Sequence, residues 1–191
     1  MMTTLKEYTY YAMSVLLFCI FASKVNASDE IRQLNIGIGH GPQAGKYVDV
    51  QKNSNFDINY TFHSKQFESN PNVEFRMGVG YTYLTTNIEQ NSELHVVTVL
   101  PSIRYNLEPN ENFQAYIGVA AGPSLMTGNQ LGYQEQGSHF LFNDYITIGA
   151  YIGENKDWEV SWSWRHLSNA DMFLPNPGID VPFSFSLGKR F

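Results

Sequence analysis

Apolar and polar side chains alternate with a period of two along eight separate segments of the chain. The clearest case is residues 73–83, where Val73, Phe75 and Met77 alternate with Glu74 and Arg76. Alternation of this kind is typical of β-strands that bury only one face. The pattern predicts strands at about residues 34–39, 56–63, 73–83, 94–105, 113–121, 140–152, 158–169 and 179–191.

Turn-forming residues separate these segments, as at 69–72, 108–112 and 153–157. No apolar run after residue 27 approaches the roughly 18 residues of a membrane helix. Strands of about ten residues can still cross a bilayer when they close into a barrel, because closure pairs every backbone donor and acceptor. We therefore predict an all-β fold, an eight-stranded antiparallel transmembrane β-barrel formed by residues 28–191.

Small residues on the inward face favour a narrow barrel whose interior is filled with side chains. In such a barrel Glu74 and Arg76 would form an ion pair in the lumen. The alternative is a soluble β-sandwich that carries these charges on its surface.

The two ends of the chain indicate export to an outer membrane. Residues 1–27 combine Lys6, an apolar stretch at 12–22 and the small residues of Val25-Asn26-Ala27, which is typical of a cleaved signal peptide. An uncleaved anchor is the alternative, but the stretch is short for a bilayer span. The last residues alternate and end on Phe191, which resembles the sorting signal of bacterial outer-membrane barrels.

That resemblance implies the cell outer membrane of a Gram-negative bacterium, with both termini periplasmic. It also implies the barrel-assembly machinery as a partner during insertion.

Composition narrows the chemistry. The formal net charge is −6 over 191 residues, and it becomes −7 when Lys6, Glu7 and Lys24 are removed with the predicted signal peptide. There is no basic run, so we expect no nucleic-acid partner. The single cysteine, Cys19, lies in the predicted signal peptide, so the mature chain would lack thiol chemistry. No metal-ligand spacing links the other histidines, which are His40, His63, His95 and His139. We therefore expect no metal and no other cofactor.

The predicted strand 158–169 carries two polar residues on its apolar face. His166 and Ser168 share the face of Trp162 and Trp164. Their Cα atoms are then roughly 7 Å apart, because side chains two residues apart project from the same side of a strand. A potential nucleophile and its base would therefore face the lipid.

Strand order places this pair in the outer leaflet. The last strand ends in the periplasm, so the preceding strand, 158–169, climbs outward and ends at the outer side. By the same count, residues 124–138 and 169–178 form outer loops. Lipopolysaccharide occupies that side of the outer membrane, so a site there would lie at the depth of its sugars and proximal acyl esters.

The sequence His166-Leu167-Ser168-Asn169, followed by Asn176-Pro177-Gly178-Ile179-Asp180, resembles the lipid A 3-O-deacylase family (PagL type) of outer-membrane serine esterases. The resemblance implies that Ser168 is the nucleophile, His166 the general base and Asp180 the third catalytic residue, where the family has a glutamate. Asn169 and Asn176 match family asparagines that would bind the oxyanion or substrate, with Asn169 the preferred oxyanion donor. The implied substrate is the lipid A part of lipopolysaccharide, surrounded by outer-membrane lipid.

The orientation of Asp180 is the difficulty in this assignment. Strict alternation with Ile179 and Val181 points its carboxylate into the lumen, away from His166. Pro182 cannot donate to a strand ladder and indicates a β-bulge, which would let Asp180 turn outward. Asp144 interrupts an otherwise apolar face, and its approach to the site is a further hypothesis.

Two other functions remain open. A calcium-dependent barrel phospholipase would hydrolyse phospholipids and would need oxygen ligands near Ser168. A non-catalytic small outer-membrane barrel, a degenerate homologue, stays open because Asp180 departs from the family pattern and a lone His-x-Ser in a strand is usually structural. The sequence leaves undecided the preferred acyl length, whether activity is latent in the membrane, and whether the chain forms a homodimer.

Overall fold

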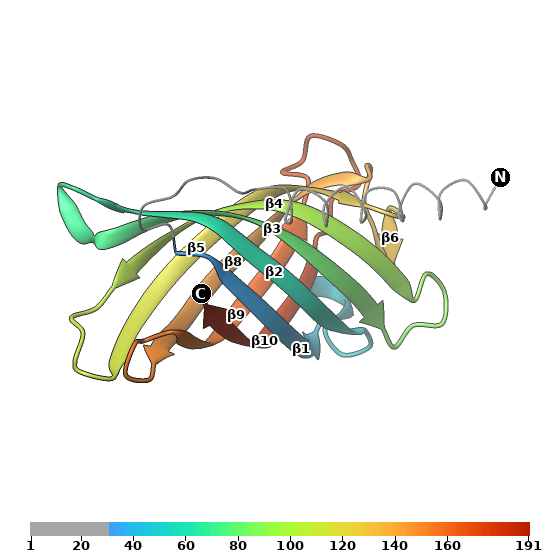
Figure 1. Cartoon of the computed structure of the whole chain (residues 1–191). Helices are drawn as coiled ribbons and strands as arrows, with labels where there is room; N and C mark the ends of the chain where they lie inside the picture. The colour runs from blue at the N-terminus through green and yellow to red at the C-terminus, as the bar shows by residue number, and fades with distance from the viewer. Residues whose placement is uncertain (1–30) are drawn as a thin grey trace. The chain divides into compact units, whose positions relative to one another are not determined.

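Eight long antiparallel strands close into a barrel in the computed structural model, which describes residues 31–191 (Figure 1). Neighbouring strands follow the order β1-β10-β9-β8-β5-β4-β3-β2, and β2 pairs with β1 to close the cylinder. The predicted all-β, eight-stranded antiparallel barrel is thus confirmed, and the sandwich alternative is wrong. The predicted signal peptide, 1–27, lies outside the described residues. The strands are β1 (Gln33–Pro42), β2 (Lys52–Phe67), β3 (Asn70–Thr86), β4 (Glu93–Asn106), β5 (Phe113–Met126), β8 (Phe140–Ile152), β9 (Trp158–Ser168) and β10 (Ile179–Arg190).

Three shorter elements lie in the connections. A 3-10 turn, η1 (Gly45–Tyr47), follows β1, and the hairpin β6 (Gln130–Leu131) and β7 (Gln134–Glu135) follows β5. The tyrosines of these two connections stack, with the rings of Tyr47 and Tyr133 4.9 Å apart. The predicted loop at 124–138 was wrong at its start, because β5 continues to Met126. Within residues 31–191, no helix has the length and apolar character needed to cross a membrane.

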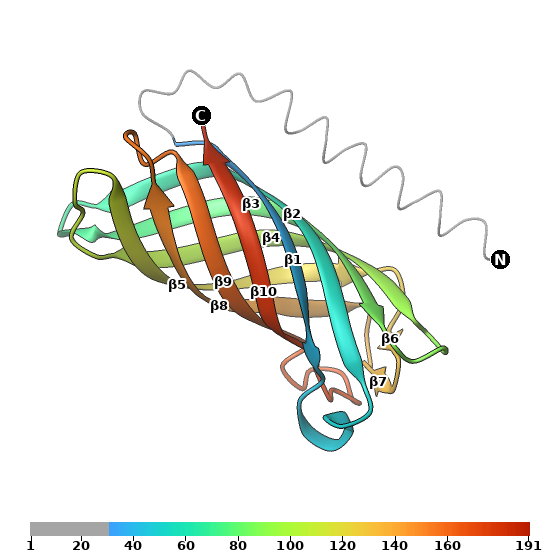
Figure 2. The same ribbon diagram turned by 90° about the horizontal axis from the view of Figure 1, so that it is seen from below.

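The two ends of the barrel differ in their connections. Gln33 pairs with Arg190, so the first and last strands meet at one end, together with the short turns 68–69, 107–112 and 153–157. We call this the terminal end. The opposite end, the loop end, carries the connections 43–51, 87–92, 127–139 and 169–178. Figure 2 shows connections 43–51 and 169–178 side by side at the loop end.

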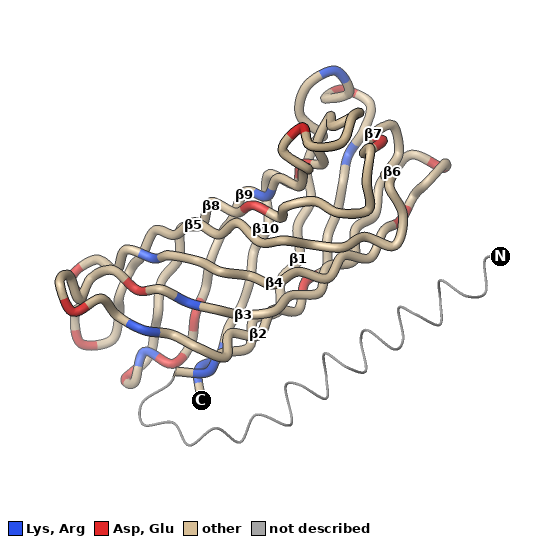
Figure 3. The backbone as a smooth tube through the Cα atoms, turned by 90° about the horizontal axis from the view of Figure 1, so that it is seen from above, with Lys and Arg blue, Asp and Glu red and all other residues tan. Residues whose placement is uncertain are grey.

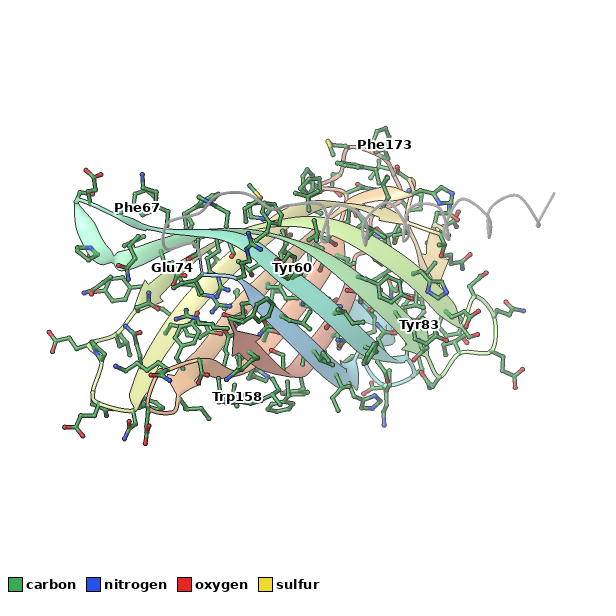
Figure 4. All side chains as sticks on the ribbon, in the orientation of Figure 1. Tyr60, Phe67, Glu74, Tyr83, Trp158 and Phe173 are labelled. Carbon is green, nitrogen blue, oxygen red and sulfur yellow. The ribbon has the colours of Figure 1, made fainter. Side chains whose placement is uncertain are left out.

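The outer wall of the barrel is apolar and the interior is polar. In β1, for example, Ile36 and Ile38 are exposed while Gln33 and Asn35 are buried. Charged residues concentrate toward the ends of the strands (Figure 3), and aromatic side chains such as Trp158 project from the wall (Figure 4). This reverses the arrangement of a water-soluble β protein, and it is the arrangement of a barrel whose wall faces lipid.

Buried charges fill much of the lumen. Glu159 accepts hydrogen bonds from Gln33 at 2.7 Å and from Arg104 at 2.5 Å, while Arg165 pairs with Asp57 at 2.7 Å. The predicted pairing of Glu74 with Arg76 is confirmed, with Arg76 Nε 3.8 Å from the carboxylate. A polar cavity of about 90 Å³ remains among these groups; its lining includes Asn35, Asp57, Asn59, Thr61, Ser102 and Glu159.

Apolar side chains fill the lumen at the loop end instead. The cluster comes from the loop-end portions of the strands and from the β6–β7 hairpin: Leu84, Leu94, Val96, Met126, Leu131, Leu141, Leu167, Ile179 and Val181. Its members from β9 and β10 alternate with outward-facing residues of the same strands. Tight packing of this kind gives those strand ends a rigid support.

Candidate active site

The last residues of β9 place His166 and Ser168 on the outer wall. Arg165 and Leu167 are fully buried, while His166 and Ser168 are partly exposed. This follows from the period of two, since Arg165 pairs in the lumen and Leu167 joins the apolar cluster. The structure therefore puts the two predicted residues on the same outward face of the sheet.

A β-bulge in β10 turns Asp180 to that face as well. Asp180 pairs with His166, and the register with β9 shifts between Val181 and Ser184. The two residues in that interval, Pro182 and Phe183, occupy the space of one on the partner strand. The bulge predicted from Pro182 is confirmed, and the inward orientation expected from strict alternation is wrong.

His166 is hydrogen-bonded to this acid. Its Nδ1 lies 2.8 Å from Asp180 Oδ1, with side-chain exposures of 31% for His166 and 5% for Asp180. A carboxylate only accepts hydrogen bonds, so Nδ1 carries the proton and Nε2 is left free to accept another. The ring also stacks on Trp164, with centroids 5.9 Å apart and planes 12° from parallel.

Ser168 is the last residue of β9 and is opposite Phe142 of β8. Within residues 31–191, the structure records no hydrogen bond between its hydroxyl and His166. Two residues apart on a strand, the side chains are adjacent on the face but not in hydrogen-bond contact. Such contacts are often looser before substrate binds. The structure thus brings Ser168 to the His166–Asp180 pair without bonding it to them.

The connection 169–178 is folded by its two asparagines. Asn169 is fully buried, and its Nδ2 donates to the carbonyl of Phe173 at 2.6 Å. Asn176 accepts the Asn169 backbone N–H at 2.9 Å and donates to Asp171 at 3.0 Å. The tip that they support carries the exposed side chain of Phe173 (Figure 4).

Gly178 ends this connection against the His166 ring. Its φ is +73°, a conformation that favours glycine, and a Cβ at this position would lie 2.4 Å from His166 Cε1. The backbone of residue 178 therefore lies directly against the imidazole.

A comparison with protein-family models matches residues 46–189 to lipid A 3-O-deacylase (PagL). The chain belongs to this family. The match spans β2 to β10 and includes His166, Ser168, Asn169, Asn176 and Asp180, so the resemblance found in the short motif extends over most of the chain.

Solved structures agree on the fold. The crystal structure of the outer membrane enzyme PagL has a TM-score of 0.62 at 18% identity, covering 82% of this chain and 98% of that one. Neisserial surface protein A (NspA) has a TM-score of 0.58 at 11% identity, covering 87% of this chain and all of that one. The comparison with curated protein sequences found no match.

Asp180 has two hydrogen-bond partners that the sequence analysis did not predict. Gln43 Nε2 donates to Asp180 Oδ2 at 2.7 Å, and Asn53 Nδ2 donates to the Asp180 carbonyl at 3.0 Å. Both are fully buried. Gln43 precedes the matched residues 46–189. The alternation of apolar and polar residues does not indicate these contacts, because they join residues near the start of the barrel sequence to β10 at its end.

Asp144 is directly opposite His166 on β8, on the side away from Asp180. The hypothesis that it approaches the site is confirmed by this pairing, although no hydrogen bond links it to His166 in the described part of the chain. Among the same residues, no group of three or more His, Cys, Asp or Glu side chains is arranged to hold a metal ion.

Proposed function

We propose that the protein is an outer-membrane serine esterase that removes the ester-linked 3-hydroxyacyl chain at position 3 of lipid A. The observation that carries the proposal is the hydrogen bond between His166 and Asp180 on the outer wall, next to Ser168. Membership in the lipid A 3-O-deacylase family supports the same substrate.

In this mechanism Ser168 is the nucleophile. Its Oγ attacks the ester carbonyl, and His166 Nε2 takes the hydroxyl proton, because a neutral hydroxyl is a weak nucleophile without a base. Collapse of the tetrahedral intermediate breaks the bond to the sugar oxygen, which receives the proton from His166. Water, deprotonated by the same nitrogen, then hydrolyses the acyl-serine ester and releases the hydroxy fatty acid.

Asp180 keeps the proton on His166 Nδ1 and stabilises the imidazolium that forms. Because Asp180 is directly opposite His166 in the ladder, the short aspartate side chain suffices to make this bond. Cross-strand partners have Cβ atoms only about 5 Å apart.

For the oxyanion we propose Asn176, with Asn169 holding the loop. Asn176 is partly exposed, and its amide has a second hydrogen available beyond the bond to Asp171. Asn169, the donor preferred from sequence, is fully buried and bonded to Phe173. Oxyanion donors of this type contribute roughly 3–4 kcal/mol where they have been measured.

The proposed membrane placement puts the loop end outside and the terminal end in the periplasm. The exposed apolar wall supports a lipid environment. PagL is itself described as an outer membrane enzyme and NspA as a surface protein. In this orientation the site opens sideways to the outer leaflet, where lipopolysaccharide is the lipid within reach.

Mass spectrometry of lipid A from cells that express wild type or Ser168→Ala tests the proposal. We expect loss of one 3-hydroxyacyl chain with wild type only. Breakdown of phospholipids with intact lipid A would favour a phospholipase instead. If both lipids stay unchanged while the barrel is correctly inserted, the protein is a non-catalytic member of the family.

A further inference from the structure

We propose that Gln43 is a positioning residue, which fixes the Asp180 carboxylate in the orientation that bonds His166. The inference rests on the proposed function, since it concerns the same acid. It adds a residue from the connection between β1 and β2 to a site otherwise built from β9, β10 and their loop.

Gln43 forms two hydrogen bonds with Asp180. Its Nε2 donates to Asp180 Oδ2 at 2.7 Å, and its Oε1 accepts the Asp180 backbone N–H at 3.0 Å. The other carboxylate oxygen, Oδ1, is the one that bonds His166. Each oxygen therefore has one partner, and together the two bonds define the plane of the carboxylate.

Burial makes the loss of these hydrogen bonds costly. Gln43 is fully buried and the Asp180 side chain is 5% exposed, so water cannot readily replace a lost bond. A buried carboxylate oxygen without a donor carries a desolvation penalty. Without Gln43, we expect Asp180 to rotate or the strand end to move, and either change lengthens the bond to His166.

Gln43 is itself held in place. Asn53 at the start of β2 donates to Gln43 Oε1 at 2.7 Å and to the Asp180 carbonyl at 3.0 Å. The Gln43 backbone N–H donates to the Gln51 backbone carbonyl at 2.9 Å, which closes the connection 43–51. The connection thus presents a preorganised amide to the acid rather than a mobile one.

The chain offers a matched control for this residue. Gln33 is also fully buried in the barrel and also donates its Nε2 to a carboxylate, that of Glu159, at 2.7 Å. It lies at the terminal end, far along β1 from the site. Methionine has nearly the length of glutamine and no amide, so Gln33→Met and Gln43→Met each remove an amide that donates to a buried carboxylate.

The experiment compares kcat, KM and thermal unfolding of purified wild type, Gln43→Met and Gln33→Met on lipid A in detergent micelles. We expect Gln43→Met to lower kcat by about tenfold to a hundredfold, as misplacement of a catalytic group by ~1 Å does, with KM little changed. We also expect the His166 Nδ1–H proton resonance, assigned by its loss in His166→Gln, to shift or vanish. Gln33→Met should leave both kcat and this resonance unchanged.

Retention of kcat and of the resonance in Gln43→Met would overturn the inference. Equal losses of kcat in both variants, in proportion to lost thermal stability, would also overturn it by showing a general structural role. If Gln43→Met does not assemble, Gln43→Asn takes the same criteria, because its amide ends one bond short of Asp180. If wild type does not deacylate lipid A, the proposed function fails, while the resonance still decides the role of Gln43.

Discussion

The imidazole of His166 is held from three directions by groups of different chemistry. Asp180 bonds its Nδ1 at 2.8 Å, Trp164 stacks on its face, and the backbone of Gly178 packs against Cε1. Because these contacts fix the ring plane, Nε2 has a defined direction on the outer wall. A single-residue change at any of the three would be expected to act on catalysis more than on folding.

Gly178→Ala is expected to lower turnover by about a hundredfold, because the new Cβ would push the imidazole out of line. Gly45→Ala is the matched control: Gly45 also has a positive φ, +80°, but has open space where its Cβ would be. Rates of lipid A deacylation by the two purified variants separate crowding of His166 from backbone strain. Equal rates for the two variants would contradict this role of Gly178.

Asp180 and Asp144 flank His166 on opposite sides, which allows a second comparison. Only Asp180 is bonded to the ring, so Asp180→Asn should lower kcat by about four orders of magnitude, as loss of a triad aspartate can. Asp144→Asn should cost no more than about tenfold, the scale of a lost weak charge interaction. A larger loss of kcat in Asp144→Asn than in Asp180→Asn would show that Asp144, and not Asp180, is the acid that supports His166.

At the scale of the element, the bulge in β10 decides which way the acid points. From Ser184 to the end of β10, the strand pairs regularly with β9, and the shift by one residue at Pro182 and Phe183 changes the face of everything before it. A one-residue slip moves a side chain to the opposite face of a sheet. With three residues between Asp180 and Ser184, the bulge therefore keeps Asp180 opposite His166.

Inserting alanine between Asp180 and Val181 should turn the acid into the lumen, because the alanine takes the place opposite His166. Deacylation should then fall to the rate of Asp180→Ala while the barrel still assembles. Deleting Pro182 is the control, since it removes the extra residue and leaves Asp180 opposite His166. Measured rates in the reverse order would show that the bulge does not set the orientation of the acid.

Across the whole molecule, the outer wall and the lumen exchange the usual positions of apolar and polar side chains. Buried ion pairs such as Arg165–Asp57 replace an apolar core along much of the lumen, and the apolar cluster is confined to the loop end. That cluster includes Leu167 and Ile179, the inward neighbours of His166 and Asp180. The site thus lies on the outside of the part of the barrel that this apolar cluster fills.

Arg165→Met should destabilise the barrel by about 3–5 kcal/mol, because it leaves the buried Asp57 carboxylate without its cation. Urea unfolding in detergent micelles measures the change, and Arg165→Met combined with Asp57→Asn should recover part of it. The folded fraction should keep a specific activity close to wild type, since Arg165 points into the lumen. A loss of activity without a loss of stability would place Arg165 in the chemistry.

Much of the candidate site could be predicted because its residues lie close together in the sequence. His166 and Ser168 share a face by their spacing alone, and Pro182 indicated the bulge that places Asp180. Gln43 could not be predicted, because 137 residues separate it from Asp180 and its contact exists only after β10 closes against β1. The burial of Asn169 was hidden for a similar reason, since it follows from how the loop folds back on itself.

The amino-acid sequence by itself predicted the eight strands of the barrel and the outward face that His166 and Ser168 share, because the period of two is a local property of an extended chain. Only the tertiary structure decided the hydrogen bond between His166 and Asp180, the hydrogen bond from Gln43 to Asp180, and the packing of Gly178 on the His166 ring. These depend on register and closure, which bring distant residues within hydrogen-bond distance, and no local pattern encodes a distance between strands.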